Sequence, residues 1–233
     1  MYFDWTYIIL VMPAVLFTMW ASSNVKNTYA RYSQHYNRRG ITGAQAARRV
    51  LDANGLRHVA IERVSGQLSD HYDPRTNIVR LSEGVYDSTS TAAVGVACHE
   101  AGHAIQYAVN YAPVKMRTAI LPITNLGAKL SMPLLVGGFL LASRSPNFIM
   151  LAYLGVACFG LSTLFQLITL PTEFNASQRA VQTIDGMGLL QGEELDGAKK
   201  VLKAAALTYV AALAVSLMQL LRFIIMVSRR RID

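Results

Sequence analysis

The sequence has 233 residues, of which 52% are hydrophobic and only 15% are charged, and its mean hydropathy is +0.29. These values are unusual for a soluble globular protein and favour a membrane protein. The net charge of +8 does not indicate a nucleic-acid-binding protein, because the arginines are scattered without interleaved aromatic residues or a known binding motif. Contact with a lipid bilayer that contains anionic lipids explains this charge better.

Three apolar segments have the length needed to span a hydrocarbon core of about 30 Å. The clearest is residues 148–170, which carry no charge. Residues 5–21 lack the basic stretch that begins a cleaved signal peptide, so we expect a retained anchor. Residues 204–227 form a C-terminal apolar helix, in which the long side chain of Arg222 can reach the lipid headgroups.

A fourth apolar segment, residues 119–143, is interrupted by one lysine and two prolines. A short connection joins it to residues 148–170, so residues 119–170 are predicted to form a transmembrane hairpin. Two crossings return the chain to the side of the membrane that it left. Residues before and after the hairpin can therefore belong to the same site.

The region after the first span predicts a small folded domain. Thr42 and Gln45 fit the two positions of a capping box, which indicates a short helix through Leu51. A turn sequence, Asp-Pro-Arg-Thr, separates two later apolar segments and indicates a hairpin. We expect a small sheet from three short, partly alternating segments: residues 59–64, 67–72 and 77–81.

The motif that carries chemistry is HEAGH at residues 99–103. On a helix, His99 and His103 are one turn apart on one face, where both imidazoles can bind one metal ion. A hydrolytic zinc ion usually has three protein ligands and a water molecule, whose pKa the ion lowers to about 7. Glu100 would accept a proton from that water. The spacing therefore predicts one Zn²⁺, and the alternative is an amphipathic helix with merely solvated histidines.

The surroundings of the motif also fit a helix. A serine in residues 88–90 can cap its start, and Pro113 is predicted to end it. Gly102 is small enough to let a neighbouring element or a substrate approach the metal closely. Cys98 and Cys158 fit no ligand spacing, and we expect no disulfide.

The third ligand should be a His, Asp or Glu that is distant in the sequence, and Glu173 follows the hairpin directly. Pro171 and Thr172 suit a helix start, which would place Glu173 in the first turn and Ser177 one turn later, where it can support a ligand. The structural alternative for Glu173 is a favourable charge at a helix N-terminus. The competing acidic residues share a charged helical stretch: Glu193, Glu194 and Asp196.

The distribution of basic residues predicts an orientation. Residues 22–118 and 171–203, on one side of the membrane, contain 16 of the 22 lysines and arginines. The positive-inside rule therefore places the catalytic region in the cytoplasm. Four full crossings would put the arginines at 229–231 outside, against the same rule. Two explanations stay open: the last apolar helix lies at the interface or crosses incompletely, or the earlier segments overrule the orientation signal of the tail.

The sequence resembles the YugP-like neutral zinc metallopeptidases of bacterial membranes over nearly its whole length. The resemblance rests on four segments: DHYDPRT (70–76), VRLS (79–82), HEAGH (99–103) and EFNAS with the following Arg-Ala pair (173–180). It implies metal binding by His99, His103 and Glu173, a catalytic Glu100 and a multi-pass membrane location. Related gluzincin-type membrane proteases typically have Asp where Ser177 stands, so the support of a zinc histidine differs here.

The predicted fold is a mainly α membrane protein with about four apolar helices and a small α+β zincin-like metallopeptidase region. The expected parts are an anchor, a catalytic region, a transmembrane hairpin, a helical segment with the third ligand and a C-terminal apolar helix: residues 5–21, 22–117, 119–170, 171–203 and 204–227. The predicted function is a zinc metalloendopeptidase that cleaves protein or peptide substrates. His71 and Arg179 are candidates for substrate contacts, and an edge strand could bind the substrate backbone.

Three other functions remain as alternatives. The chain could be a catalytically silent zinc-binding membrane scaffold, although such a protein has no need of Glu100. Residues 195–197, Leu-Asp-Gly, are similar to a ligand motif of site-2-type intramembrane proteases. The motif at 99–103 also occurs in AAA-coupled proteases, but this chain has no phosphate-binding loop. The sequence leaves partner membrane proteins open and identifies none.

Overall fold

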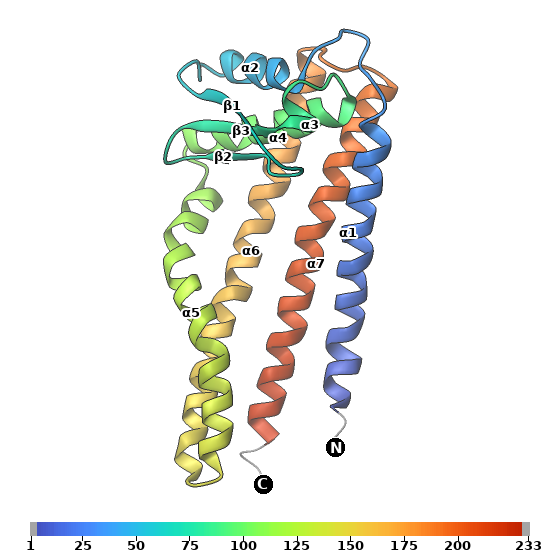
Figure 1. The fold of residues 1–233 in the computed structure, drawn as a ribbon. Coiled ribbons are helices and arrows are strands. Elements are labelled where there is room, and N and C mark those ends of the chain that lie inside the picture. Colours follow the sequence, from blue (N-terminus) through green and yellow to red (C-terminus); the bar gives the residue numbers. More distant parts are fainter. Residues whose placement is uncertain (1–3, 230–233) are drawn as a thin grey trace. The chain divides into compact units, whose positions relative to one another are not determined.

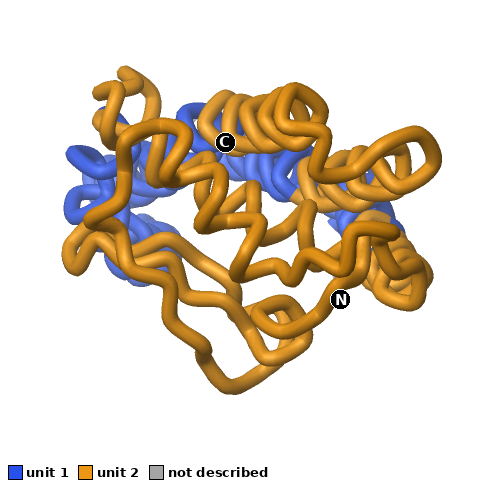
Figure 2. Tube along the Cα trace, turned by 90° about the horizontal axis from the view of Figure 1, so that it is seen from above, with its two compact units in different colours: residues 1–20, 116–170, 209–233 blue, residues 21–115, 171–208 orange. Residues whose placement is uncertain are grey.

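A computed structural model describes residues 4–229, and most of them are helical (Figure 1). The chain divides into two compact units (Figure 2). Unit 1 comprises residues 1–20, 116–170 and 209–233, and unit 2 comprises residues 21–115 and 171–208. The mainly α fold with a small sheet is confirmed.

Four helices of the described chain are long and apolar enough to cross a membrane, as predicted. Each is longer than its apolar segment, because backbone hydrogen bonding continues into polar residues at the helix ends. Two of them are preceded by a short turn of another helix type, η1 (Tyr7–Val11) and η2 (Pro146–Phe148). The four helices are α1 (Met12–Tyr32), α5 (Ala112–Ala142), α6 (Ile149–Gly186) and α7 (Glu193–Arg229).

In unit 1, α5 and α6 form the predicted hairpin, and small residues let their backbones meet. A Cβ atom on Gly138 would collide with the backbone nitrogen of Ala152, and one on Gly155 would lie 2.7 Å from that of Leu135. Close backbone approach at small residues is the usual packing of membrane helices. A cluster that includes Leu135, Ala152 and Phe223 continues this packing to α7.

Arg222 has a different environment from the predicted one. Instead of only reaching toward headgroups, its guanidinium binds the carboxylate of Asp4, with Nε 3.0 Å from Oδ2, and lies 5.2 Å from the ring centre of Tyr7. Asp4 thus lies beside the last turns of α7. Of the arginines at 229–231, the last two are outside the described residues.

Unit 2 begins with the end of α1, followed by α2 (Gly43–Ala53). The predicted capping box is confirmed, since the Thr42 hydroxyl accepts from the Gln45 backbone N–H and the Gln45 side chain accepts from that of Thr42. The sheet has the order β1 (Ala60–Val64), β3 (Ile78–Ser82), β2 (His71–Asp73).

Strand β1 is parallel to β3, and β2 is antiparallel to it, with Asp73 opposite Ile78. The predicted hairpin is confirmed, but the strand predicted over residues 67–72 is too long. Gly66 and Leu68 have positive φ angles of 103° and 55°, so the chain turns there before β2 begins.

The motif lies on α4 (Thr91–Ala108), which follows the short helix α3 (Glu83–Tyr86). The hydroxyl of Ser90 accepts from the Ala93 backbone N–H and caps α4, as predicted. Pro113 does not end this helix. Asn110, with φ of 55°, turns the chain, and Pro113 lies in the first turn of α5, where its missing N–H has no helical partner to lose.

Candidate metal centre

Three predicted ligands converge within unit 2. Nε2 of His99 is 3.4 Å and Nε2 of His103 is 3.5 Å from Oε2 of Glu173, and the three ligand atoms lie within 4.8 Å of one another. The two imidazole planes are inclined by 84°, with ring centres 4.7 Å apart. Two imidazoles and one carboxylate form the donor set of catalytic zinc sites that keep one position open. The described residues therefore fit a zinc ion.

The position of Glu173 within its helix differs from the predicted one. This residue does not lie in a first helical turn, because α6 continues through Pro171 without ending. The proline removes only one hydrogen bond of the helix, and the rest of α6 maintains its direction. A favourable charge at a helix N-terminus therefore does not explain Glu173, which is only 3% exposed.

Gly102 lets α4 and α6 approach each other at the centre. A Cβ atom on Gly102 would lie 2.8 Å from the carbonyl oxygen of Ala176. The neighbouring element that the sequence predicted is thus α6. Gly102 directly precedes His103, and Ala176 follows Glu173 by three residues. Only glycine fits a backbone approach of this kind.

The second ring nitrogen of each histidine also has a partner. The Ser177 hydroxyl is 3.2 Å from Nδ1 of His99, which agrees with the predicted supporting position. Oε1 of Gln106 is 3.0 Å from Nδ1 of His103. In both rings Nε2 is therefore the atom directed at Glu173, and partners of this kind orient metal-binding histidines.

The carboxylates affect the charge of His103. Burial lowers its pKa, but the hydrogen bond to Glu173 and the charges of Glu100 and Glu173 raise it more, so the net direction is upward. Glu100 itself is on α4 and is 8% exposed. The site thus combines two imidazoles with two nearby acidic groups, and positive charge is stabilised there.

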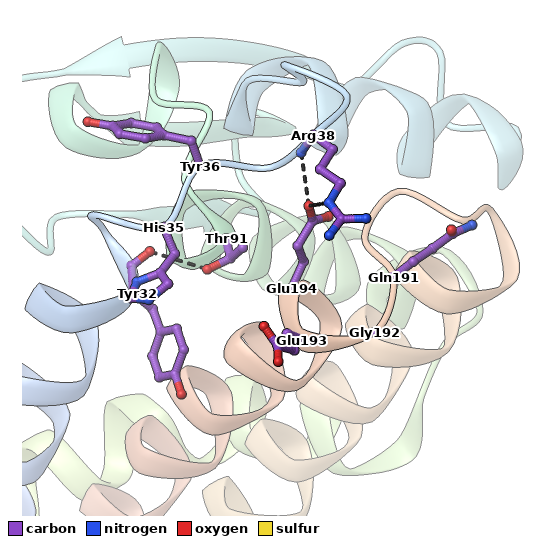
Figure 3. A pocket seen from close by; sticks show the side chains of 9 residues that line it. All are labelled: Tyr32, His35, Tyr36, Arg38, Thr91, Gln191, Gly192, Glu193 and Glu194. Carbon is purple, nitrogen blue, oxygen red and sulfur yellow. Dashed lines mark hydrogen bonds and ion pairs between the residues drawn. The ribbon is translucent and has the colours of Figure 1, made fainter.

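The competing acidic residues lie elsewhere. Glu193 and Glu194 line a different cavity of about 680 Å³, in which Glu194 accepts a hydrogen bond from the backbone N–H of Arg38 (Figure 3). Asp196 is exposed and pairs with Lys199. None of the three belongs to the metal-binding group found among residues 4–229. The Leu-Asp-Gly string at 195–197 therefore does not supply a ligand to this centre.

The segment at residues 70–82 has a structural use. Asp73 accepts hydrogen bonds from the backbone of Arg75 and from the side chains of Thr76 and Arg80. Asp70 accepts from the backbone N–H and hydroxyl of Ser82. These bonds hold the β2–β3 hairpin, so this part of the motif determines the shape of the sheet. His71 is exposed, and its Nδ1 lies 2.8 Å from the Ser69 carbonyl oxygen.

Arg179 also contacts its own helix. Its Nε donates to Oδ1 of Asn175 at 2.7 Å, and the same oxygen accepts from Nε2 of Gln106 at 2.9 Å. Sequence reasoning missed Gln106 and Asn175. The available signal was the spacing, since Gln106 follows His103 by three residues and so lies on the same helix face.

The two cysteines take no part in this centre. Cys98 and Cys158 are both free thiols, as predicted. Cys98 is buried in the core of unit 2, and burial raises the pKa of its thiol. A protonated, buried thiol is a structural residue rather than a reactive one.

Comparison with known proteins agrees with the motifs and the geometry. Residues 7–228 match the family described as "Putative neutral zinc metallopeptidase". The chain is 46% identical over 218 residues to the "Putative membrane protease YugP" of Bacillus subtilis (strain 168). The aligned residues make up 94% of this chain and 95% of that protein. No solved structure was found to match. The resemblance predicted from the sequence is confirmed, and the chain belongs to this family of neutral zinc metallopeptidases.

Proposed function

We propose that the protein is an integral-membrane zinc endopeptidase in which His99, His103 and Glu173 bind one Zn²⁺ and Glu100 is the general base. The observation that supports this most strongly is the convergence of Nε2 of both histidines on Oε2 of Glu173, at 3.4 and 3.5 Å. Residues on two helices, 70 positions apart in the sequence, supply one donor set.

Glu100 has the position and the chemistry of a proton carrier. It follows His99 on α4, and its charge acts on His103. When bound, Zn²⁺ lowers the pKa of a water molecule to about 7 and polarises a carbonyl group. Glu100 takes one proton from the attacking water and passes it to the amine of the departing peptide, so that the carboxylate is restored after each cleavage.

Strand β2 is the best candidate to align a substrate. It is at an edge of the sheet, and Tyr72 on β2 packs against Tyr107 on α4, with ring centres 5.6 Å apart. An extended peptide added to such an edge forms backbone hydrogen bonds that accept many side chains. We therefore expect protein or peptide substrates with a weakly restricted sequence.

We further propose that unit 2 faces the cytoplasm. This is supported by the 16 of 22 basic residues in residues 22–118 and 171–203, nearly all of which belong to unit 2. Protease accessibility of tags at the two ends of the chain, in inverted and right-side-out vesicles, tests this orientation. Both tags should be accessible only from the outer side. Access to both from the cytoplasmic side would reverse the orientation.

The test of the catalytic function is zinc analysis of the purified full-length protein together with cleavage of an unfolded protein substrate. Wild type should contain one zinc per chain and cleave the substrate. Glu100→Gln should keep the zinc and lose cleavage, because the amide cannot accept the proton. Equal cleavage by both proteins would overturn the mechanism. Bound zinc with no cleavage by wild type would favour the silent scaffold.

A further inference from the structure

Gln106 connects one histidine of the centre with the segment that carries the carboxylate. It lies one turn after His103 on α4 and is fully buried. Its Oε1 is 3.0 Å from Nδ1 of His103, and its Nε2 donates to the Thr172 carbonyl oxygen at 2.8 Å and to Oδ1 of Asn175 at 2.9 Å. Thr172 and Asn175 are on either side of Glu173 in the sequence.

Two groups in the hydrogen-bond network of Gln106 can only accept or only donate hydrogen bonds. A backbone carbonyl such as that of Thr172 only accepts hydrogen bonds, and a guanidinium only donates them. Because Nε of Arg179 donates to Oδ1 of Asn175, this atom must be an oxygen that accepts. Both neighbours of Nε2 of Gln106 are therefore acceptors. The Gln106 amide must place its nitrogen on their side and its oxygen beside His103.

This orientation determines where the His103 ring carries its proton. An amide oxygen beside Nδ1 requires a hydrogen on Nδ1, which leaves the lone pair of the neutral ring on Nε2. Nε2 is the atom that lies 3.5 Å from Oε2 of Glu173. The reversed amide would direct its own hydrogens at Nδ1 and favour a proton on Nε2, where a proton excludes a metal ion.

We propose that Arg179, Asn175 and Gln106 form a one-way hydrogen-bond chain that keeps His103 in the tautomer whose Nε2 can bind zinc. Gln106 is a positioning residue, and the proposal rests on the zinc site of the proposed function. His99 has a partner of another kind. The Ser177 hydroxyl, 3.2 Å from its Nδ1, can donate or accept, so it does not select a tautomer.

The test is the zinc dissociation constant of the full-length protein in detergent micelles, measured by competition with a chelator. Gln106→Met keeps the length of the side chain but removes its polar atoms. We expect zinc to bind about 10- to 100-fold more weakly, the usual effect of losing a group that orients a ligand. Asn175→Asp keeps an acceptor oxygen for both donors and should bind zinc nearly as tightly as wild type.

Asn37→Leu is the matched control for stability. Asn37 is also buried in unit 2, and its side chain donates to the Ile41 carbonyl oxygen at 2.8 Å, but it contacts no proposed ligand. This variant should lower the thermal midpoint and keep the zinc affinity. If it weakened zinc binding as much as Gln106→Met does, the loss would reflect stability and the proposal would be wrong.

A spectroscopic measurement tests the hydrogen bond at Nδ1 of His103 directly. In zinc-loaded protein labelled with ¹⁵N-histidine, His103 of wild type and of Asn175→Asp should show an Nδ1 proton that exchanges slowly with water. Gln106→Met should lose this slow exchange. Unchanged zinc affinity and exchange in Gln106→Met would overturn the proposal. Tight zinc binding without cleavage by wild type would instead overturn the proposed function and leave the chain of hydrogen bonds intact.

Discussion

Replacing Gly102 by alanine tests whether the close approach of α4 and α6 is needed for the metal centre. The added Cβ would lie 2.8 Å from the Ala176 carbonyl oxygen, whereas an ordinary contact begins at 3.4 Å. The helices must therefore separate by about 0.6 Å, and zinc–ligand distances tolerate only about 0.2 Å. Since the histidines and Glu173 are on opposite helices, we expect zinc to bind at least about tenfold more weakly.

The same substitution should also lower the free energy of unfolding. Alanine is the better helix former by about 1 kcal/mol, so a helix free of this contact would gain stability. Overpacking against a backbone atom costs about 1 to 3 kcal/mol and should outweigh that gain. The measurements are chelator competition for zinc and thermal unfolding of the purified protein with and without zinc.

Gly95→Ala is the control on the same helix. Its Cβ would lie 3.3 Å from the Cβ of Ala198, so a shift of only about 0.1 Å restores an ordinary contact, and no proposed ligand is involved. This variant should keep the zinc affinity of wild type. If Gly102→Ala bound zinc as tightly as Gly95→Ala, the close approach would not determine the geometry of the centre.

Three further predictions concern charge. Glu173→Gln removes the anionic ligand, so zinc affinity should fall by about 100-fold or more in the same competition assay, and an unchanged affinity would exclude Glu173 as a ligand. The pKa of His103 is raised above 6.5, so zinc must displace a proton from this ring. As the pH decreases, the zinc affinity should therefore begin to fall while the pH is still above 6.5. Calorimetry in two buffers should detect the released proton. The hydrogen bonds from the Arg75 backbone, Arg80 and Thr76 lower the pKa of Asp73 from 3.8 to about 2, so its stabilising effect is complete above pH 3.8 and disappears as the pH falls toward 2. Asp73→Asn should remove this part of the pH dependence of unfolding, and an identical acid transition would show that these bonds do not affect stability.

The local features of the fold were predictable because their signals lie within a few residues. The capping box of α2 and the serine cap of α4 depend on backbone N–H groups three positions away. The two prolines misled the prediction for a related reason. Proline weakens a helix, but position decides the effect: Pro113 lies at the start of α5, and Pro171 lies inside a helix of 38 residues that the rest of the sequence supports.

The supporting groups of the centre could not be predicted in the same way. Gln106 is an unremarkable residue in a helical sequence until α6 brings the Thr172 carbonyl and Asn175 beside it. Arg179 was expected to contact a substrate, because the sequence alone does not show that its Nε donates to Asn175. Roles of this kind depend on contacts between helices, which one sequence does not contain.

Glu173 is an intermediate case, and the reason is topological. Nothing local marks it as a ligand, and its predicted place in a first helical turn was wrong. The decisive information was the even number of crossings between His103 and Glu173, because two apolar helices return the chain to the side where it started. This argument needs only the number of spans, which hydropathy gives more reliably than the ends of helices. The proximity of Glu173 to both histidines in the structure agrees with that parity, which allows residues on the two flanks of the hairpin to share a site.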